Sequence, residues 1–212
     1  MMNTRETIEM MQLVAKGMVA NEPALTKYDQ AIGDGDHGLG IERGFSQVAS
    51  YLSDDFSARD VGDVMTKVGT KLMSTMGGAS GAIFGTLFRA GGKAIAGEKQ
   101  LTSSVFARFL DAGLEGIYKR GGASEGAKTM IDALAPAMRR AYQLADVDFR
   151  QAIAEVAEAA EQGVERTKEM IATTGKAKTL GERSLGHPDP GAISMSLLLK
   201  FMAKYACTEV VA

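Results

Sequence analysis

The sequence predicts an all-α fold, an up-and-down bundle of eight helices, on three observations. Apolar residues recur at helical spacing in almost every segment between clusters of glycine. No stretch alternates apolar and polar residues as a half-buried strand would. The 212 residues are 45% hydrophobic and 24% charged, the balance of a globular protein able to bury one core. We therefore expect one domain over residues 1–212.

The first four expected helices each present an apolar face. They run from about 4 to 20, from about 37 to 52, from about 61 to 72 and from about 80 to 96. The first carries Ile8, Met11, Ala15 and Met18 on one side. Ser57 or Asp60 could cap the third helix, because both residue types accept hydrogen bonds from the first helical turn.

The last four expected helices begin at Ser103 or Ser104 and end near residue 206. They cover about 103–117, 126–144, 148–172 and 191–206. Pro136 predicts a kink or break inside the sixth helix, because proline lacks the backbone N–H. The eighth helix is apolar nearly all round, which predicts a place in the middle of the bundle.

Composition excludes several classes of protein. With 24 basic and 26 acidic residues the net charge is −2, so the chain lacks the basic field of a non-specific nucleic-acid binder. Cys207 is the one cysteine, so no internal disulfide can form. The start lacks a signal core, and no stretch has the ~18 uncharged apolar residues of a membrane span. We expect a cytoplasmic protein without direct contact with membrane or nucleic acid.

The connections after the odd-numbered helices are unusual. Residues 29–38, 77–81, 120–127 and 175–191 contain over half of the 25 glycines and both histidines. The connections at about 52–58, 97–102 and 145–147 are short and plain. In an up-and-down bundle, odd-numbered connections lie at the same end, so the four unusual ones should converge there. Convergent irregular loops on a rigid scaffold are where function usually lies.

Asp29, Asp34 and Asp36 form the first candidate site, within the first unusual connection. Carboxylates this close repel one another unless solvent or a cation compensates them. Either they are solvated turn residues and helix caps, or they bind a metal, for which an all-oxygen set favours Mg²⁺ or Mn²⁺ over zinc. The spacing does not fit an EF-hand. The GDGDHG string matches a dinucleotide-binding pattern, but no strand precedes it, so a metal-bridged phosphate is the better prediction.

The other unusual connections offer phosphate and base contacts. Residues 77–81, GGASG, lead into a helix whose N-terminal N–H groups suit an anion, although the glycines at 77, 81 and 85 also suit close helix packing. Residues 121–130 could form a floor for a flat base, on weak evidence. The last connection could act as a lid carrying Lys176, Lys178 and Arg183. His37 and His187 each precede an even-numbered helix, where a capping or hydrogen-bonding role is favoured over catalysis.

Four strings resemble a known family. YDQAIGDGDHGLGIERGF, MGGASGAIFGTLF, RGGASEGAKTMIDAL and LGERSLGHPDPGA, in this order, are similar to the nucleotide-binding L subunit of phosphotransferase-dependent dihydroxyacetone kinase. The resemblance covers the whole chain. It implies an eight-helix antiparallel barrel that holds ADP and two Mg²⁺ at one end.

The resemblance also implies residue roles. Metal binding falls to Asp29, Asp34 and Asp36, and phosphate contacts fall to His37, Gly38, Leu39, Ala79 and Ser80. Adenosine-facing positions are Gly121 and Met130, and the closing turn is Asp189, Pro190 and Gly191. Two positions depart from the family: Gly40 stands where relatives often have a polar residue, and Lys176 stands where an arginine approaches the nucleotide. No residue is expected to act as a nucleophile.

The same resemblance implies partners. A separate K subunit would hold the hydroxyketone and a separate M subunit would supply phosphate from a phosphohistidine, so that bound ADP becomes ATP and then phosphorylates dihydroxyacetone. Two alternatives stay open: a subunit of a related kinase for another small ketose or polyol, and a nucleotide-sensing regulator that binds a transcription factor.

Overall fold

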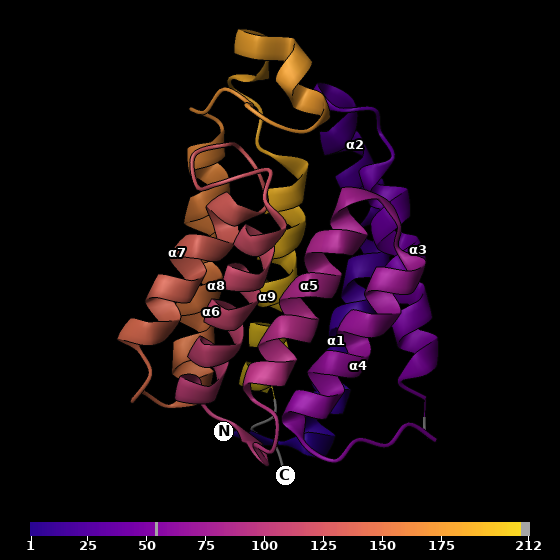
Figure 1. Ribbon diagram of the computed structural model, residues 1–212, viewed down its shortest axis with the longest axis vertical. Helices are drawn as coiled ribbons and strands as arrows, with labels where there is room; N and C mark the ends of the chain where they lie inside the picture. The colour runs from indigo at the N-terminus through magenta and orange to yellow at the C-terminus, as the bar shows by residue number, and fades with distance from the viewer. Residues whose placement is uncertain (54, 209–212) are drawn as a thin grey trace.

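Eight long helices close into a ring in the computed structural model, which describes residues 1–53 and 55–208 (Figure 1). They are α1 (Thr4–Ala20), α3 (His37–Tyr51), α4 (Val61–Thr75), α5 (Gly78–Ala94), α6 (Ser103–Arg120), α7 (Ile131–Gln143), α8 (Phe149–Thr167) and α9 (Pro190–Thr208). Each packs against the next in chain order, and α1 packs against both α3 and α9. The expected antiparallel all-α fold is confirmed, and the α1–α9 contact closes it into a barrel.

Three kinds of element were not predicted. Helix α2 (Glu22–Ile32) lies between α1 and α3, and η1 (Lys176–Ser184) is a 3₁₀ segment before α9. Strands β1 (Met2–Asn3) and β2 (Gln100–Leu101) pair antiparallel, with Met2 opposite Leu101. Pro23 in the first turn of α2 is compatible with a helix, since the first N–H groups have no helical acceptor. Residues 29–32 are therefore helical, and the first unusual connection is only 33–36.

The core lies inside the ring and is rich in aromatic and methionine side chains. Phe45 and Phe84 meet edge to face at 5.9 Å between ring centroids, and Phe88, Phe106 and Phe109 continue the cluster. Helix α9 is not central as predicted, because Lys200 and Lys204 on it are exposed. It is a member of the ring that also packs against α2 and α7, and these extra contacts bury most of its surface. Of the described helices, none combines the length and the hydropathy that a membrane span requires.

Several predicted helix ends were wrong for identifiable reasons. Helix α7 begins at Ile131 and not at 126, because Gly126 and Lys128 have positive φ angles that an α-helix does not allow. It continues through Pro136, so packing between α6 and α8 outweighs the lost hydrogen bond. Helix α8 ends at Thr167 and not near 172.

One predicted helix N-cap is confirmed and another was wrong. Asp60, one of the two predicted candidates, caps α4 by accepting from the N–H of Asp63 at 2.8 Å. Helix α6 is capped by Thr102, one residue before the predicted serines, through the N–H of Val105. The predicted connection at 52–58 includes residue 54, which lies outside the described residues.

Candidate nucleotide and metal site

The four unusual connections meet at one end of the barrel, as predicted. Figure 1 shows α2 and η1 at this end and both chain termini at the other. Side chains join the connections: His37 reaches Ser80 on α5 and Ser194 on α9, and Lys176 on η1 reaches the α2–α3 connection. The N–H of Thr173 donates to the carbonyl of Ala127 at 3.3 Å, which joins the α6–α7 and α8–α9 connections.

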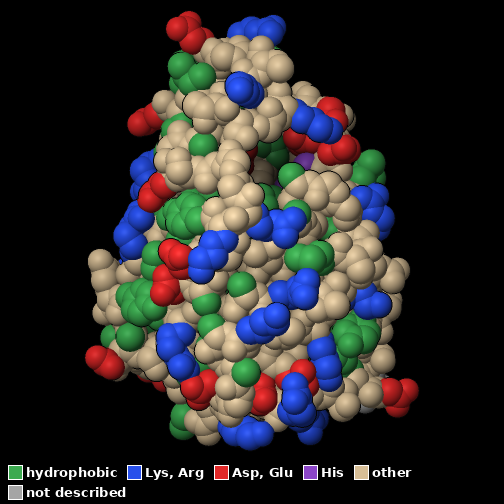
Figure 2. Space-filling model, viewed as in Figure 1, with side chains coloured by type: hydrophobic (Ala, Val, Ile, Leu, Met, Phe, Trp, Pro, Cys, Tyr) green, Lys and Arg blue, Asp and Glu red, His purple; other side chains and the backbone are tan. Residues whose placement is uncertain are grey.

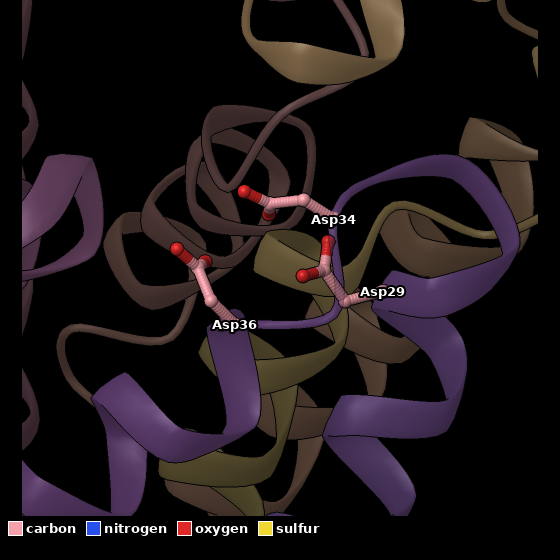
Figure 3. Close-up of side chains that lie close together, drawn as sticks. All are labelled: Asp29, Asp34 and Asp36. Atoms are coloured by element: carbon pink, nitrogen blue, oxygen red, sulfur yellow. The ribbon is translucent and has the colours of Figure 1, made fainter.

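The three aspartates converge on one point at this end (Figure 3). Each offers a carboxylate oxygen, and these oxygens lie within 4.8 Å of one another. Asp29 is in the last turn of α2 and is buried, whereas Asp34 and Asp36 are exposed on the connection. Gly33 ends α2 where a β-carbon would collide with the Asp29 carboxylate. The glycine therefore leaves the space in which Asp29 turns toward the other two.

Lys176 provides a positive charge in contact with this cluster. Its ammonium group forms ion pairs with Asp34 and with Asp36, the latter at 3.2 Å. A lysine that bridges two carboxylates shows that the position suits a cation. Figure 2 shows the surface hollowed below the tip of the molecule, with acidic, basic and histidine side chains at the rim. The all-oxygen donor set and its charge fit a hard divalent ion such as Mg²⁺.

His37 links three elements at the floor of the site. Its backbone N–H donates to Asp29 at 3.1 Å, its Nδ1 lies 3.0 Å from Ser80 Oγ, and its Nε2 lies 3.1 Å from Ser194 Oγ. Burial of the ring lowers the pKa of His37, although Asp29 opposes this effect. A ring bonded through both nitrogens agrees with the predicted hydrogen-bonding role.

The N-terminus of α5 carries the predicted phosphate turn. Gly77 caps the helix with φ 75°, a left-handed conformation that favours glycine. Ala79 is exposed and Ser80 half-buried in the first turn, ahead of the first helical hydrogen bond from Gly81 to Gly77. Their N–H groups therefore have no helical acceptor. Close packing is also present, because a β-carbon on Gly85 would lie 2.6 Å from Met73 Cβ on α4.

The first turn of α3 holds the next three predicted residues in different surroundings. Gly38 is buried against α2, where a β-carbon would lie 2.5 Å from the carbonyl oxygen of Glu22. Leu39 points outward with 52% of its surface exposed. A β-carbon on Gly40 would make ordinary contacts, with the carbonyl oxygen of Met76 at 3.9 Å and Arg43 at 4.0 Å. Arg43, which the sequence analysis missed, donates to the carbonyls of Thr75 and Met76 where α4 ends.

The predicted adenosine-facing residues lie at the two ends of the α6–α7 connection. Gly121 ends α6 with φ 76°, and Met130 is buried just before α7. A β-carbon on Gly191 would lie 2.8 Å from Met130 Cγ, so these two residues are in contact. Asp189 caps α9 by accepting from the N–H of Ala192 at 2.7 Å. Burial of its carboxyl group raises the pKa of Asp189 to about 7.

The charged residues of the last connection differ in whether they contact the aspartates. Lys176 alone among the predicted lid cations reaches the aspartates, while Lys178 and Arg183 are exposed. His187 is exposed too, and contributes its carbonyl oxygen, which accepts from Lys128.

Besides Arg43, sequence reasoning missed two supporting side chains, Asp132 and Ser194, and it placed Lys128 only in a possible floor for a base. Asp132 is buried and accepts from the N–H groups of Gly126 and Thr129, which shapes the α6–α7 connection. Ser194 holds the ring of His37, and Lys128 is fully enclosed. Thr129 three residues before Asp132 resembles a helix-start signal and could have revealed Asp132. Nothing in the sequence marks Ser194 or the enclosed position of Lys128, because their partners are distant along the chain.

Comparison with known proteins identifies the family. The DAK2 domain matches residues 31–204. The chain is 41% identical to PEP-dependent dihydroxyacetone kinase 1, ADP-binding subunit DhaL, of Listeria innocua, over 90% of this chain and 89% of that one. It is 38% identical to the PEP-dependent dihydroxyacetone kinase ADP-binding subunit DhaL of Escherichia coli, over 84% of this chain and 86% of that one.

A solved structure has the same fold. The dihydroxyacetone kinase from C. freundii, in complex with AMP-PNP and Mg²⁺, matches with a TM-score of 0.73 and 29% identity, over 93% of this chain. The chain spans 33% of that protein, so the likeness concerns one part of a longer kinase. The two DhaL subunits, in contrast, are matched over nearly their full length. The chain therefore belongs to the DAK2 domain family, and within it to the DhaL subunits of dihydroxyacetone kinases.

Proposed function

We propose that this chain holds ADP or ATP with Mg²⁺ at the end of the barrel where the four connections meet, and serves as the phosphoryl-carrying subunit of a dihydroxyacetone kinase. The convergence of Asp29, Asp34 and Asp36 within 4.8 Å carries the proposal. The names of the DhaL relatives, which specify ADP binding, and the AMP-PNP and Mg²⁺ complex of the C. freundii enzyme support it.

The three aspartates would hold the metal. Their three negative charges suit two divalent ions that share nucleotide phosphates as further ligands, and this ion count is part of the proposal. Bound Mg²⁺ would neutralise charge that develops on the phosphoryl oxygens during transfer. Lys176 would leave Asp34 and Asp36 when the cation binds, and its ammonium group would then face the phosphates.

Two helix N-termini would bind the phosphates. The first turn of α3 contributes His37, Gly38, Leu39 and Gly40, and the first turn of α5 contributes Ala79 and Ser80. Both helices direct the positive end of their dipoles toward the aspartate cluster, which favours an anion held next to the metal. His37 keeps the two helices in register through Ser80.

The adenosine side would be formed by the other two connections. Gly121 and Met130 would face the base and ribose, and the turn of Asp189, Pro190 and Gly191 would close the pocket behind Met130. No side chain of this chain is assigned a covalent role, because phosphoryl transfer needs positioning and charge stabilisation from the protein.

The substrate would come from a partner. In the proposed cycle, an M-type donor subunit transfers phosphate from a histidine to bound ADP, and the ATP formed gives its γ-phosphate to dihydroxyacetone on a K-type subunit. Residues 1–212 form the nucleotide-binding unit in this proposal, and it retains the cytoplasmic location expected from the sequence. Binding of the nucleotide-loaded chain to a transcription regulator stays open as an alternative role.

The first experiment asks whether the purified chain carries nucleotide. Mass spectrometry of the denatured protein should detect ADP or ATP, and added ADP should raise Tm only when Mg²⁺ is present. Absence of both results would refute nucleotide binding.

The second experiment asks about the division of labour. The chain alone with ATP and dihydroxyacetone should turn over negligibly, and a K-type subunit should permit one turnover from bound ATP. Sustained turnover should require the donor subunit. Rapid phosphorylation by this chain alone would contradict the proposal, and transfer only to another ketose or polyol would favour the related-kinase alternative.

A further inference from the structure

Lys128 is unusual in both its backbone and its side chain. Its φ angle is 63°, and among the described residues it is the one non-glycine residue with a positive φ. A side chain in this conformation is strained, and such strain persists only where surrounding structure enforces it. The side chain is also enclosed, with 2% of the residue exposed. A lysine is rarely fully buried unless its charge has partners.

The ammonium group of Lys128 finds its partners in four backbone carbonyls. It donates to Thr167, Ser184 and His187, each at 2.7 Å, and to Met170 at 3.1 Å. These carbonyls come from the last turn of α8, the segment after it, the end of η1 and the connection to α9. The carbonyl end of a helix carries partial negative charge, which favours a cation at this position. One side chain therefore joins four successive parts of the chain, between Thr167 and His187, to the α6–α7 connection.

The same segments carry the proposed adenosine pocket. Met130 follows Lys128 by two residues, and Gly191 follows the 184–189 segment and touches the Met130 side chain. The N–H of Asp189 donates to Thr167 Oγ1 at 2.9 Å, so the turn is fixed to the end of α8 that Lys128 also binds. Asp29, Asp34 and Asp36 and the first turns of α3 and α5 lie in other parts of the chain, whereas the hydrogen bonds of the Lys128 ammonium group go to carbonyls between residues 167 and 187.

We propose that Lys128 is a positioning residue for the adenosine side of the site: its ammonium group fixes the 121–130 connection to the 184–189 segment and so holds Met130 against Gly191. The inference rests on the proposed nucleotide function and makes it more specific. It separates the site into an adenosine side that depends on Lys128 and a phosphate side that does not.

The test compares two ligands on one variant. Calorimetric titration with ADP and with pyrophosphate, each with Mg²⁺, should show the Kd for ADP raised at least tenfold in Lys128→Met. The Kd for pyrophosphate should stay within twofold of wild type. A role limited to stability would leave both affinities unchanged at a temperature well below Tm. Lys204→Met, at an exposed position of α9, is the matched control and should bind both ligands as wild type does.

Two further measurements keep the inference testable if Lys128→Met does not fold. Lys128→Gly relieves the backbone strain while removing the ammonium group, and should lose ADP affinity in the same selective way. In the wild type, ADP should slow amide exchange at Ala172 and Gly186, which bond to Ser184 and Lys168, more than pyrophosphate does. Unchanged ADP affinity in a folded variant, or equal protection by both ligands, would overturn the inference. If the wild type fails to bind ADP, the proposed function itself fails.

Discussion

Replacing Asp34 by asparagine should have opposite effects with and without metal. Charges on carboxylate oxygens 4.8 Å apart or closer repel by at least about 0.9 kcal/mol in water and at least about 3.5 kcal/mol at an effective dielectric constant of ~20. The variant relieves part of this repulsion and loses an exposed ion pair with Lys176, worth less than about 1 kcal/mol. Without metal and nucleotide, Asp34→Asn should therefore fold with a Tm equal to or slightly above that of wild type.

With Mg²⁺ and nucleotide the same substitution removes a charged ligand. The loss of a strong ligand from a metal-bridged phosphate should cost several kcal/mol of transition-state stabilisation, which is a rate loss on the order of a thousandfold. The increase in Tm on adding ADP and Mg²⁺ should shrink for the same reason. A solvated turn residue would give neither effect, since surface substitutions usually change stability by less than about 0.5 kcal/mol.

The assay is single-turnover phosphate transfer from preloaded ATP to dihydroxyacetone on a K-type subunit, measured beside Tm. Asp146→Asn is the matched control, because Asp146 is exposed in the α7–α8 connection at the other end of the barrel. It should transfer at the wild-type rate. Near-normal transfer by a folded Asp34→Asn protein would refute the assignment of Asp34 to the metal.

Three further predictions concern packing, protonation and the histidine bridge. Gly38→Ala should lower the unfolding free energy by about 1–3 kcal/mol in denaturant titration, because its β-carbon would collide with α2; an unchanged midpoint would show that the contact is loose. Burial raises the pKa of Asp189 to about 7, so ionising this carboxyl group opposes folding. The stability of the protein should therefore fall as pH rises from about 4 to 7. In Asp189→Asn, Tm should change less with pH over this range. A profile that falls equally in both proteins would contradict this. His37→Ala should cost about 1–3 kcal/mol and weaken ADP binding, since Ser80 and Ser194 lose a shared partner; thermal unfolding and calorimetry check both, and wild-type ADP affinity would refute the bridging role.

The local pattern of the sequence was enough for much of the fold. Helical periodicity is a short-range property, so the eight long helices could be read from neighbouring residues, and Asp60 was one of two cap candidates found in the same way. The meeting of four glycine-rich connections at one end followed from the assumed up-and-down arrangement. The spacing of three aspartates within eight residues is likewise a local signal, and it indicated the candidate metal cluster. The short helix α2 was not predicted, because Pro23 and the polar residues around it resemble a connection.

Tertiary structure decided what depends on residues distant along the chain. The strained backbone of Lys128 is compensated by carbonyls 39 to 59 positions away, and its positive φ angle lies just before the start of α7 at Ile131. The hydrogen bond between His37 and Ser194 spans 157 positions, and the ion pair between Lys176 and Asp36 spans 140. Spacing along the chain determines which side chains share a helix face, whereas only closure of the ring brings α3, α5 and α9 within hydrogen-bond distance of one imidazole. The sequence by itself therefore determined the helices and the aspartate cluster, and the closed barrel determined which groups hold that cluster and its surroundings in place.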